Sequence, residues 1–220
     1  MSYTDEIRYQ DINKVLYSPY YGALADKQHG TGIMTKKDFL ADKIALAEQM
    51  FAILGGKDPE FLKLLFTADA LASAPFGFGG EKVLRENYQY DKNQITQKIA
   101  QKLQLSETLI KSLDRNSVNG DTSLEVILLH KLSDSVENLD SITPEIKEQF
   151  LACARSGKIT KEFIQQLRNQ TPPPEREEKV TAQEASMRYV LSKMTEQQKE
   201  NPLKHLLRIK ESDFAQLQQK

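Results

Sequence analysis

Apolar side chains recur at helical spacing along most of the chain, and polar caps mark where the runs begin. The clearest run carries Phe61, Leu65 and Leu71 and is apolar on nearly all sides, which is typical of a helix at the centre of a bundle. No window shows the sustained alternation of apolar and polar residues that a half-buried strand requires. The pattern therefore predicts an all-α protein.

Cap signals divide this pattern into separate helices. Asp58-Pro59-Glu60 combines a capping side chain, a proline at the first helical position and an acid near the positive end of the helix dipole. Thr35 with Asp38 forms a second start signal, and Gly55-Gly56 ends that run. We expect a loop with one helical turn over 20–33, and helices over 7–17, 35–54, 58–71, 81–88, 91–103, 106–113, 123–139, 143–156 and 160–167, with two more in the tail.

A change in composition near residue 171 separates a body from a tail. Residues 1–170 are predicted to form one helical domain, and 171–180, rich in proline and charge, a semi-extended linker. Residues 181–220 then form a C-terminal helical tail, too short to build much core alone. It must dock on its own body or on another protein. We expect the partner-binding side chains to be Leu203, Leu206, Leu207 and Phe214.

Composition narrows the classes of partner. Charged residues make up 28% of the 220 residues, but the formal net charge is only −1, so nucleic acid is not an expected ligand. The chain shows no secretory signal peptide and no run of about 18 apolar residues, which favours a cytoplasmic protein without a membrane span. Cys153 is the single cysteine, which excludes a disulfide framework within the chain.

The segment Pro75-Phe76-Gly77-x-Gly79-Gly80-Glu81 resembles a loop of the HD-domain phosphohydrolases, above all the deoxyguanosine triphosphate triphosphohydrolases. Their loop reads His-Asp-x-Gly-His-x-Pro-Phe-Gly-His-x-Gly-Glu, and we interpret the glycines as a tight turn. Upstream, the chain matches a second pattern of the same family in similar order. The matching residues are Asp11, Lys14, Val15, Ser18, Tyr20, Tyr21, Leu24, Lys27 and Gln28. The resemblance spans roughly residues 8–88 and implies an HD-like helical bundle with a C-terminal helical appendage.

The same resemblance implies that the metal site of the family is lost. The first ligand histidine falls on Leu40, the His-Asp pair on Asp69-Ala70, and the two loop histidines on Ser73 and Phe78. Leucine and alanine have no donor atom for a metal. We therefore expect no catalytic residues, no metal and no cofactor, with Ser73, Phe78 and Glu81 marking a relict pocket.

These features favour a non-catalytic protein that acts as a protein–protein interaction module. It would serve as an adaptor or subunit of a larger bacterial assembly, a secretion system being one such case. One alternative is a metal-dependent nucleotide phosphohydrolase with an altered site that draws on Asp69, Glu81, His130 and Asp134; the family's fourth ligand falls near His130-Lys131 or Asp134. Another alternative is a protein that binds nucleotides without chemistry, as a regulator or secreted effector.

Overall fold

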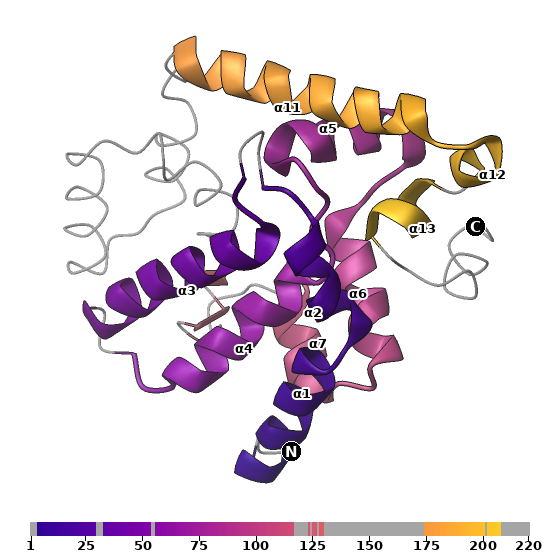
Figure 1. Ribbon diagram of the computed structural model, residues 1–220. Helices are drawn as coiled ribbons and strands as arrows, with labels where there is room; N and C mark the ends of the chain where they lie inside the picture. The colour runs from indigo at the N-terminus through magenta and orange to yellow at the C-terminus, as the bar shows by residue number, and fades with distance from the viewer. Residues whose placement is uncertain are drawn as a thin grey trace.

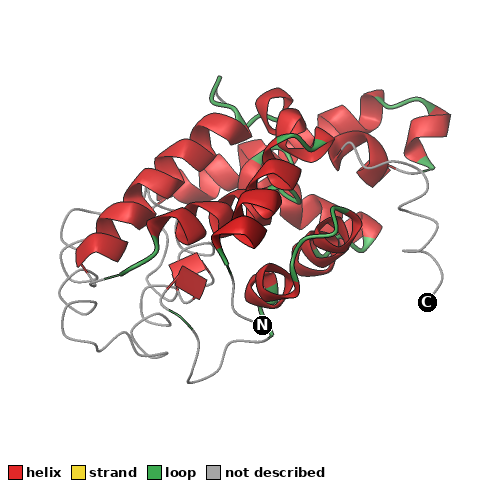
Figure 2. Cartoon of the chain, turned by 90° about the horizontal axis from the view of Figure 1, so that it is seen from below, coloured by secondary structure: helices red, strands yellow, loops and turns green. Residues whose placement is uncertain are grey.

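The computed structural model describes residues 4–29, 33–53, 56–116, 123, 125–126, 128–129, 174–200 and 202–207. Within these ranges every regular element is a helix and there is no strand, which confirms the all-α prediction (Figure 2). The elements are α1 Asp5–Leu16, α2 Pro19–Ala23, the short 3-10 helix η1 Leu24–Asp26, α3 Lys36–Ile53, α4 Pro59–Ala70, α5 Gly77–Tyr88, α6 Lys92–Lys102, α7 Glu107–Leu113, α11 Pro174–Lys193, α12 Glu196–Lys199 and α13 Pro202–Leu207.

Local capping chemistry explains where several helices begin. The Asp58 carboxylate accepts a hydrogen bond from the Phe61 amide at 3.0 Å, at the start of α4. Thr35 and Asp38 cap α3 reciprocally, since the Asp38 amide donates to the Thr35 hydroxyl at 3.1 Å and the Thr35 amide donates back at 3.2 Å. Such bonds satisfy amide groups that have no partner within the helix. The predicted starts of α3 and α4 are thus confirmed.

Helix α4 forms the centre of the described body. It packs beside α3 and also contacts α1, α6 and α7 (Figure 1). Leu62 and Leu65 are fully enclosed and Phe66 is 1% exposed, as expected for a helix that is apolar on nearly all sides. Asp11 joins α1 to α7, because its carboxylate accepts hydrogen bonds from Ser106 at the start of α7.

The loop from α4 to α5 turns sharply. Phe76 and Gly77 both have positive φ, +60° and +55°, in the left-handed region that glycine adopts without strain and phenylalanine rarely adopts. The segment after η1 holds this loop, because Lys27 donates to the Ser73 carbonyl at 3.0 Å and the Phe76 amide donates to the Gln28 carbonyl at 2.8 Å. Residues some 50 positions apart are therefore joined at the turn.

The tail docks on its own body. Helix α11 lies across α5, and α13 also contacts α5 (Figure 1). Helix α11 begins at Pro174, so residues 174–180 are helical and the predicted semi-extended linker over 171–180 is wrong for that part. Proline at the first helical position needs no hydrogen-bond partner for its nitrogen, which explains why a proline-rich stretch can open a helix.

Several predictions fall elsewhere in the chain. The helices expected over 143–156 and 160–167, and Phe214 in the tail, lie outside the described residues, and only five residues of 123–139 lie within them. No helix in the described ranges is both long enough and apolar enough to cross a membrane.

Candidate functional site

A small cavity lies between α3 and α4, and several positions that the HD resemblance singles out line it. The residues that line it are Lys36, Phe39, Leu40, Lys43, Asp69, Ala70, Ser73 and Lys92. Four of the predicted site positions are therefore brought together: Leu40, Asp69, Ala70 and Ser73. The cavity measures about 20 Å³, which is close to the space of a single water molecule.

The carboxylate of Asp69 is the acidic group of this cavity, and it is engaged by cations of the chain itself. The Lys92 ammonium lies 2.8 Å from Asp69 Oδ2, and the Arg115 guanidinium lies 3.9 Å from Oδ1. The side chains of Asp69 and Lys92 are only 4% and 11% exposed. This is a buried ion pair, in which each charge depends on the other because water cannot replace it.

The surroundings of Asp69 keep it ionised. Burial by itself raises the pKa of the Asp69 carboxyl, because it disfavours the charged form. The positive charges of Lys92, Arg115 and Lys43 lower the pKa by more than burial raises it. The result is an Asp69 pKa well below its usual range, so the group carries a negative charge at neutral pH.

The residues of the cavity do not fit the metal that the HD resemblance would imply. Leu40 and Ala70 offer no donor atom, and the Asp69 carboxylate is already held by an ammonium group. Among the residues that the structure describes, no three His, Cys, Asp or Glu side chains are grouped so that they could share a metal ion. A metal centre needs further donor atoms beside such a carboxylate. In this chain the group beside Asp69 is the ammonium of Lys92.

The predicted relict pocket is only partly correct. Ser73 lines the cavity, but Phe78 is 48% exposed and lies against Arg85, whose guanidinium is 5.7 Å from the ring centroid. Phe78 therefore does not line the cavity, which corrects the prediction. Glu81 is buried apart from the cavity lining, and its carboxylate accepts a hydrogen bond from the Tyr90 hydroxyl at 3.3 Å.

The leucines predicted to contact a partner are also placed differently. Leu203, Leu206 and Leu207 are 7%, 9% and 0% exposed and belong to the chain's own core. Of the two placements expected for the tail, these three residues show docking on the chain's own body, which corrects the prediction that they contact a partner. The physical reason is that the body offers α13 an apolar surface, which removes the leucines from water.

The glycines after Pro75 have a second role that the sequence did not reveal. Built on Gly79, a Cβ atom would lie 2.6 Å from Gln183 Cβ and from the Val180 carbonyl oxygen, both on α11. A side chain there would push α11 away, so Gly79 permits the close approach of two helices. No local spacing could have indicated this, because α11 lies about 100 residues further along the chain.

Helix α5 begins at Gly77 rather than at the predicted Glu81, and of the glycines after Pro75 only Gly77 has a positive φ, so the tight-turn interpretation is wrong for Gly79 and Gly80.

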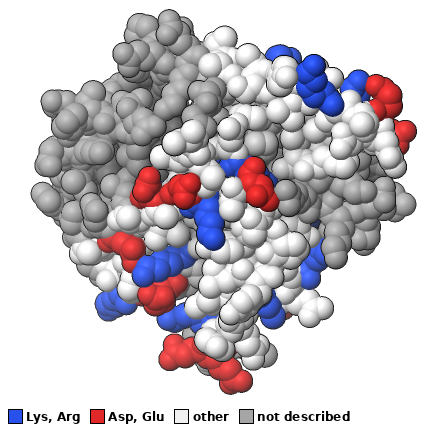
Figure 3. Space-filling model, in the orientation of Figure 1, with Lys and Arg blue, Asp and Glu red and all other residues white. Residues whose placement is uncertain are grey.

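Sequence reasoning also missed the lysines of the cavity. Lys36 and Lys92 occupy the first positions of α3 and α6, where a positive charge is unfavourable next to the positive end of the helix dipole. Lysines at two such positions are a signal that a tertiary contact holds them there. On the face shown in Figure 3, acidic and basic side chains are interspersed rather than gathered by sign.

No family model matches the chain, and no curated protein shows significant sequence similarity to it.

Proposed function

We propose that this chain is a non-catalytic helical protein, built on an HD-like scaffold, that acts as a protein–protein interaction module. The observation that carries the proposal is the ion pair of Lys92 with Asp69 at 2.8 Å, beside Leu40 and Ala70. Metal-assisted hydrolysis needs an ion that polarises the substrate or generates hydroxide. Here an ammonium group holds the carboxylate that such an ion would need.

Exposed apolar side chains support the binding role. Tyr17 is 85% exposed, Tyr189 is 64% exposed, and Ile33 is fully exposed. Aromatic residues are enriched where proteins bind one another, because they bury much area with little loss of side-chain freedom. We propose that the module is an adaptor or subunit of a larger assembly, in the cytoplasm of a bacterium.

An activity assay tests the catalytic part of the proposal. Purified protein is expected to hydrolyse no deoxynucleoside triphosphate in the presence of magnesium, manganese or cobalt. Metal-dependent turnover that Asp69→Asn abolishes, and that the control variant Asp5→Asn keeps, would overturn the proposal. Asp5 is a suitable control because its side chain is 99% exposed.

A capture experiment tests the binding part. The immobilised full chain is expected to recover a specific protein from extracts of the source cell, identified by mass spectrometry. Tyr17→Ser or Tyr189→Ser should weaken recovery, whereas Ser192→Ala, an exposed position on α11, should not. Recovery that is the same for all four chains would remove the proposed role of the exposed tyrosines.

One observation favours a second candidate, a regulatory protein that binds a nucleotide without chemistry. Lys36, Lys43 and Lys92 line the cavity, and ammonium groups attract phosphate. The cavity of about 20 Å³ is far smaller than a nucleotide, so only a phosphate oxygen could enter it in this conformation. Calorimetry with a panel of nucleotides decides: heat at millimolar ligand that Lys43→Ala removes would favour this candidate, and no heat would exclude it.

A further inference from the structure

The cavity between α3 and α4 has room for one small occupant. It measures about 20 Å³, which suits a particle of the size of a water molecule and is too small for a phosphate group or a nucleotide. The cavity is partly open to the surface, so a small ion can reach it while the chain stays folded. Its occupant is therefore either water or a monatomic ion.

Lysine side chains give the described lining of this cavity more positive than negative charge. Among the described residues, Lys36, Lys43 and Lys92 line it together with a single carboxylate, that of Asp69. Lys36 is 4% exposed and Lys43 is 7% exposed, whereas a lysine usually extends its ammonium group into water. These charges lie inside the body, where an opposite charge nearby stabilises them more than it would in water.

The placement of the lysines concentrates this positive charge. The Lys43 ammonium lies 5.6 Å from the centre of the Phe66 ring, and Phe66 is itself 1% exposed. Lys36 begins α3 and Lys92 begins α6, so the positive ends of two helix dipoles add to the potential of the ammonium groups.

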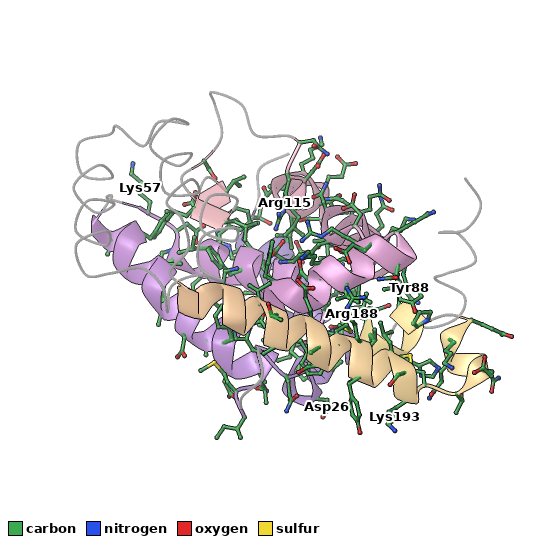
Figure 4. All side chains as sticks on the ribbon, turned by 90° about the horizontal axis from the view of Figure 1, so that it is seen from above. Asp26, Lys57, Tyr88, Arg115, Arg188 and Lys193 are labelled. Atoms are coloured by element: carbon green, nitrogen blue, oxygen red, sulfur yellow. The ribbon has the colours of Figure 1, made fainter. Side chains whose placement is uncertain are left out.

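The Asp69 carboxyl shows the sign of the potential at the cavity. Burial raises its pKa, but the charges of Lys92, Arg115 and Lys43 together lower the pKa by more. Figure 4 shows Arg115 on the side of the body opposite to Lys193, so Arg115 rather than this end of α11 extends the basic surroundings of Asp69. Three cations of the described residues thus act on one carboxylate.

The lysines have donors enough for a further ligand. An ammonium group carries three N–H donors, and the bond of Lys92 to Asp69 at 2.8 Å uses one of them. A lysine that already holds one partner can therefore donate to an anion as well. A water molecule in the cavity leaves the positive charge of the lining unchanged, whereas an anion of the same size reduces it.

We propose that this cavity binds a monatomic anion of the halide class, held by Lys36, Lys43 and Lys92. Chloride would be a ligand that strengthens the packing of α3 and α6 on α4. The inference goes beyond the proposed function, because it concerns a ligand of the chain itself and holds whether or not a partner protein binds. It also differs from nucleotide binding, since the cavity has no room for a phosphate group.

Urea unfolding in matched salts tests the inference. Sodium chloride is compared with sodium gluconate at the same ionic strength, because gluconate is too large for the cavity and both salts screen surface charges alike. An ion that binds only the folded chain stabilises it by mass action. Chloride at about twenty times its dissociation constant should raise the urea midpoint of the wild-type chain by about 0.9 M relative to gluconate.

Lys43→Met should abolish this difference between the salts, because methionine keeps much of the length of lysine but has no N–H donors. Lys82→Met is the matched control and should keep the difference, since Lys82 is 47% exposed and is not part of the cavity lining. If Lys43→Met does not fold, Lys36→Met removes another of the three ammonium groups. Equal midpoints of the wild-type chain in the two salts, or an unchanged difference in Lys43→Met, would overturn the inference.

Bromide locates the ion directly. Crystals of the wild-type chain in sodium bromide should show anomalous scattering in the cavity, beside the ammonium groups of Lys36 and Lys43. Density without anomalous scattering there, as from water, would overturn the inference even if chloride stabilises the chain, because the ion would then act elsewhere. None of these outcomes bears on the proposed function, which fails on metal-dependent turnover whatever the halide does.

Discussion

The variant Lys92→Met tests the ion pair at the centre of the cavity, because methionine keeps much of the length of lysine but removes the charge. Asp69 is 4% exposed, so the carboxylate that remains could not be solvated by water. Removing one partner of a buried pair costs about 3–5 kcal/mol. Arg115, at 3.9 Å, still compensates part of the charge, and we expect a loss of about 2–4 kcal/mol.

Urea unfolding followed by circular dichroism measures this loss. With a slope of about 2 kcal/mol per molar urea, the midpoint should fall by about 1–2 M. Lys82→Met is the matched control, because Lys82 forms a similar pair with Glu184 but is 47% exposed, and exposed pairs contribute about 0–1 kcal/mol.

A double variant identifies the cause. Lys92→Met combined with Asp69→Leu removes both charges, and apolar replacement of a whole buried pair is often neutral or stabilising. We therefore expect the double variant to recover most of the stability that Lys92→Met loses. A loss below about 1 kcal/mol for Lys92→Met, or a double variant less stable than the single one, would refute the role of Lys92 as the cation of Asp69.

Three further predictions use the same unfolding assay. Because the pKa of Asp69 is lowered in the folded state, its contribution is complete above its unfolded pKa of about 3.9 and is lost as pH falls below that value, so Asp69→Asn should flatten the acid limb of stability. Asp11→Ala should cost about 2–3 kcal/mol, because the carboxylate accepts two hydrogen bonds from Ser106, and the exposed control Asp5→Ala should change stability by less than about 0.5 kcal/mol. Gly22→Ala should stabilise the chain by about 0.5–1 kcal/mol, whereas Gly80→Ala, whose Cβ would collide with the Pro75 carbonyl, should destabilise it. A destabilising Gly22→Ala together with a stabilising Gly80→Ala, or equal effects at Asp11 and Asp5, would contradict the packing described.

Local patterns predicted much of the helical framework. Asp58-Pro59-Glu60 and the Thr35 cap placed the starts of α4 and α3, because a cap depends on residues only three positions apart. The nearly continuous apolar surface of α4 predicted its central place, which needs no knowledge of what surrounds it. Four of the positions that the HD resemblance singled out also line one cavity.

The predictions that failed concern which distant segments meet. Phe78 was predicted to fill a pocket, but it lies on α5 and is 48% exposed. The tail leucines were predicted to face a partner, and they are buried against the chain's own helices.

Helical periodicity and capping are short-range effects, so this sequence by itself determined its helical class, the starts of α3 and α4, and the buried side of α4. The identity of the cation beside Asp69, and of the helix against Gly79, depends on residues 23 and 104 positions away. Tertiary packing alone decides such contacts, because a lysine or a glycine looks the same in the sequence whichever distant surface it meets.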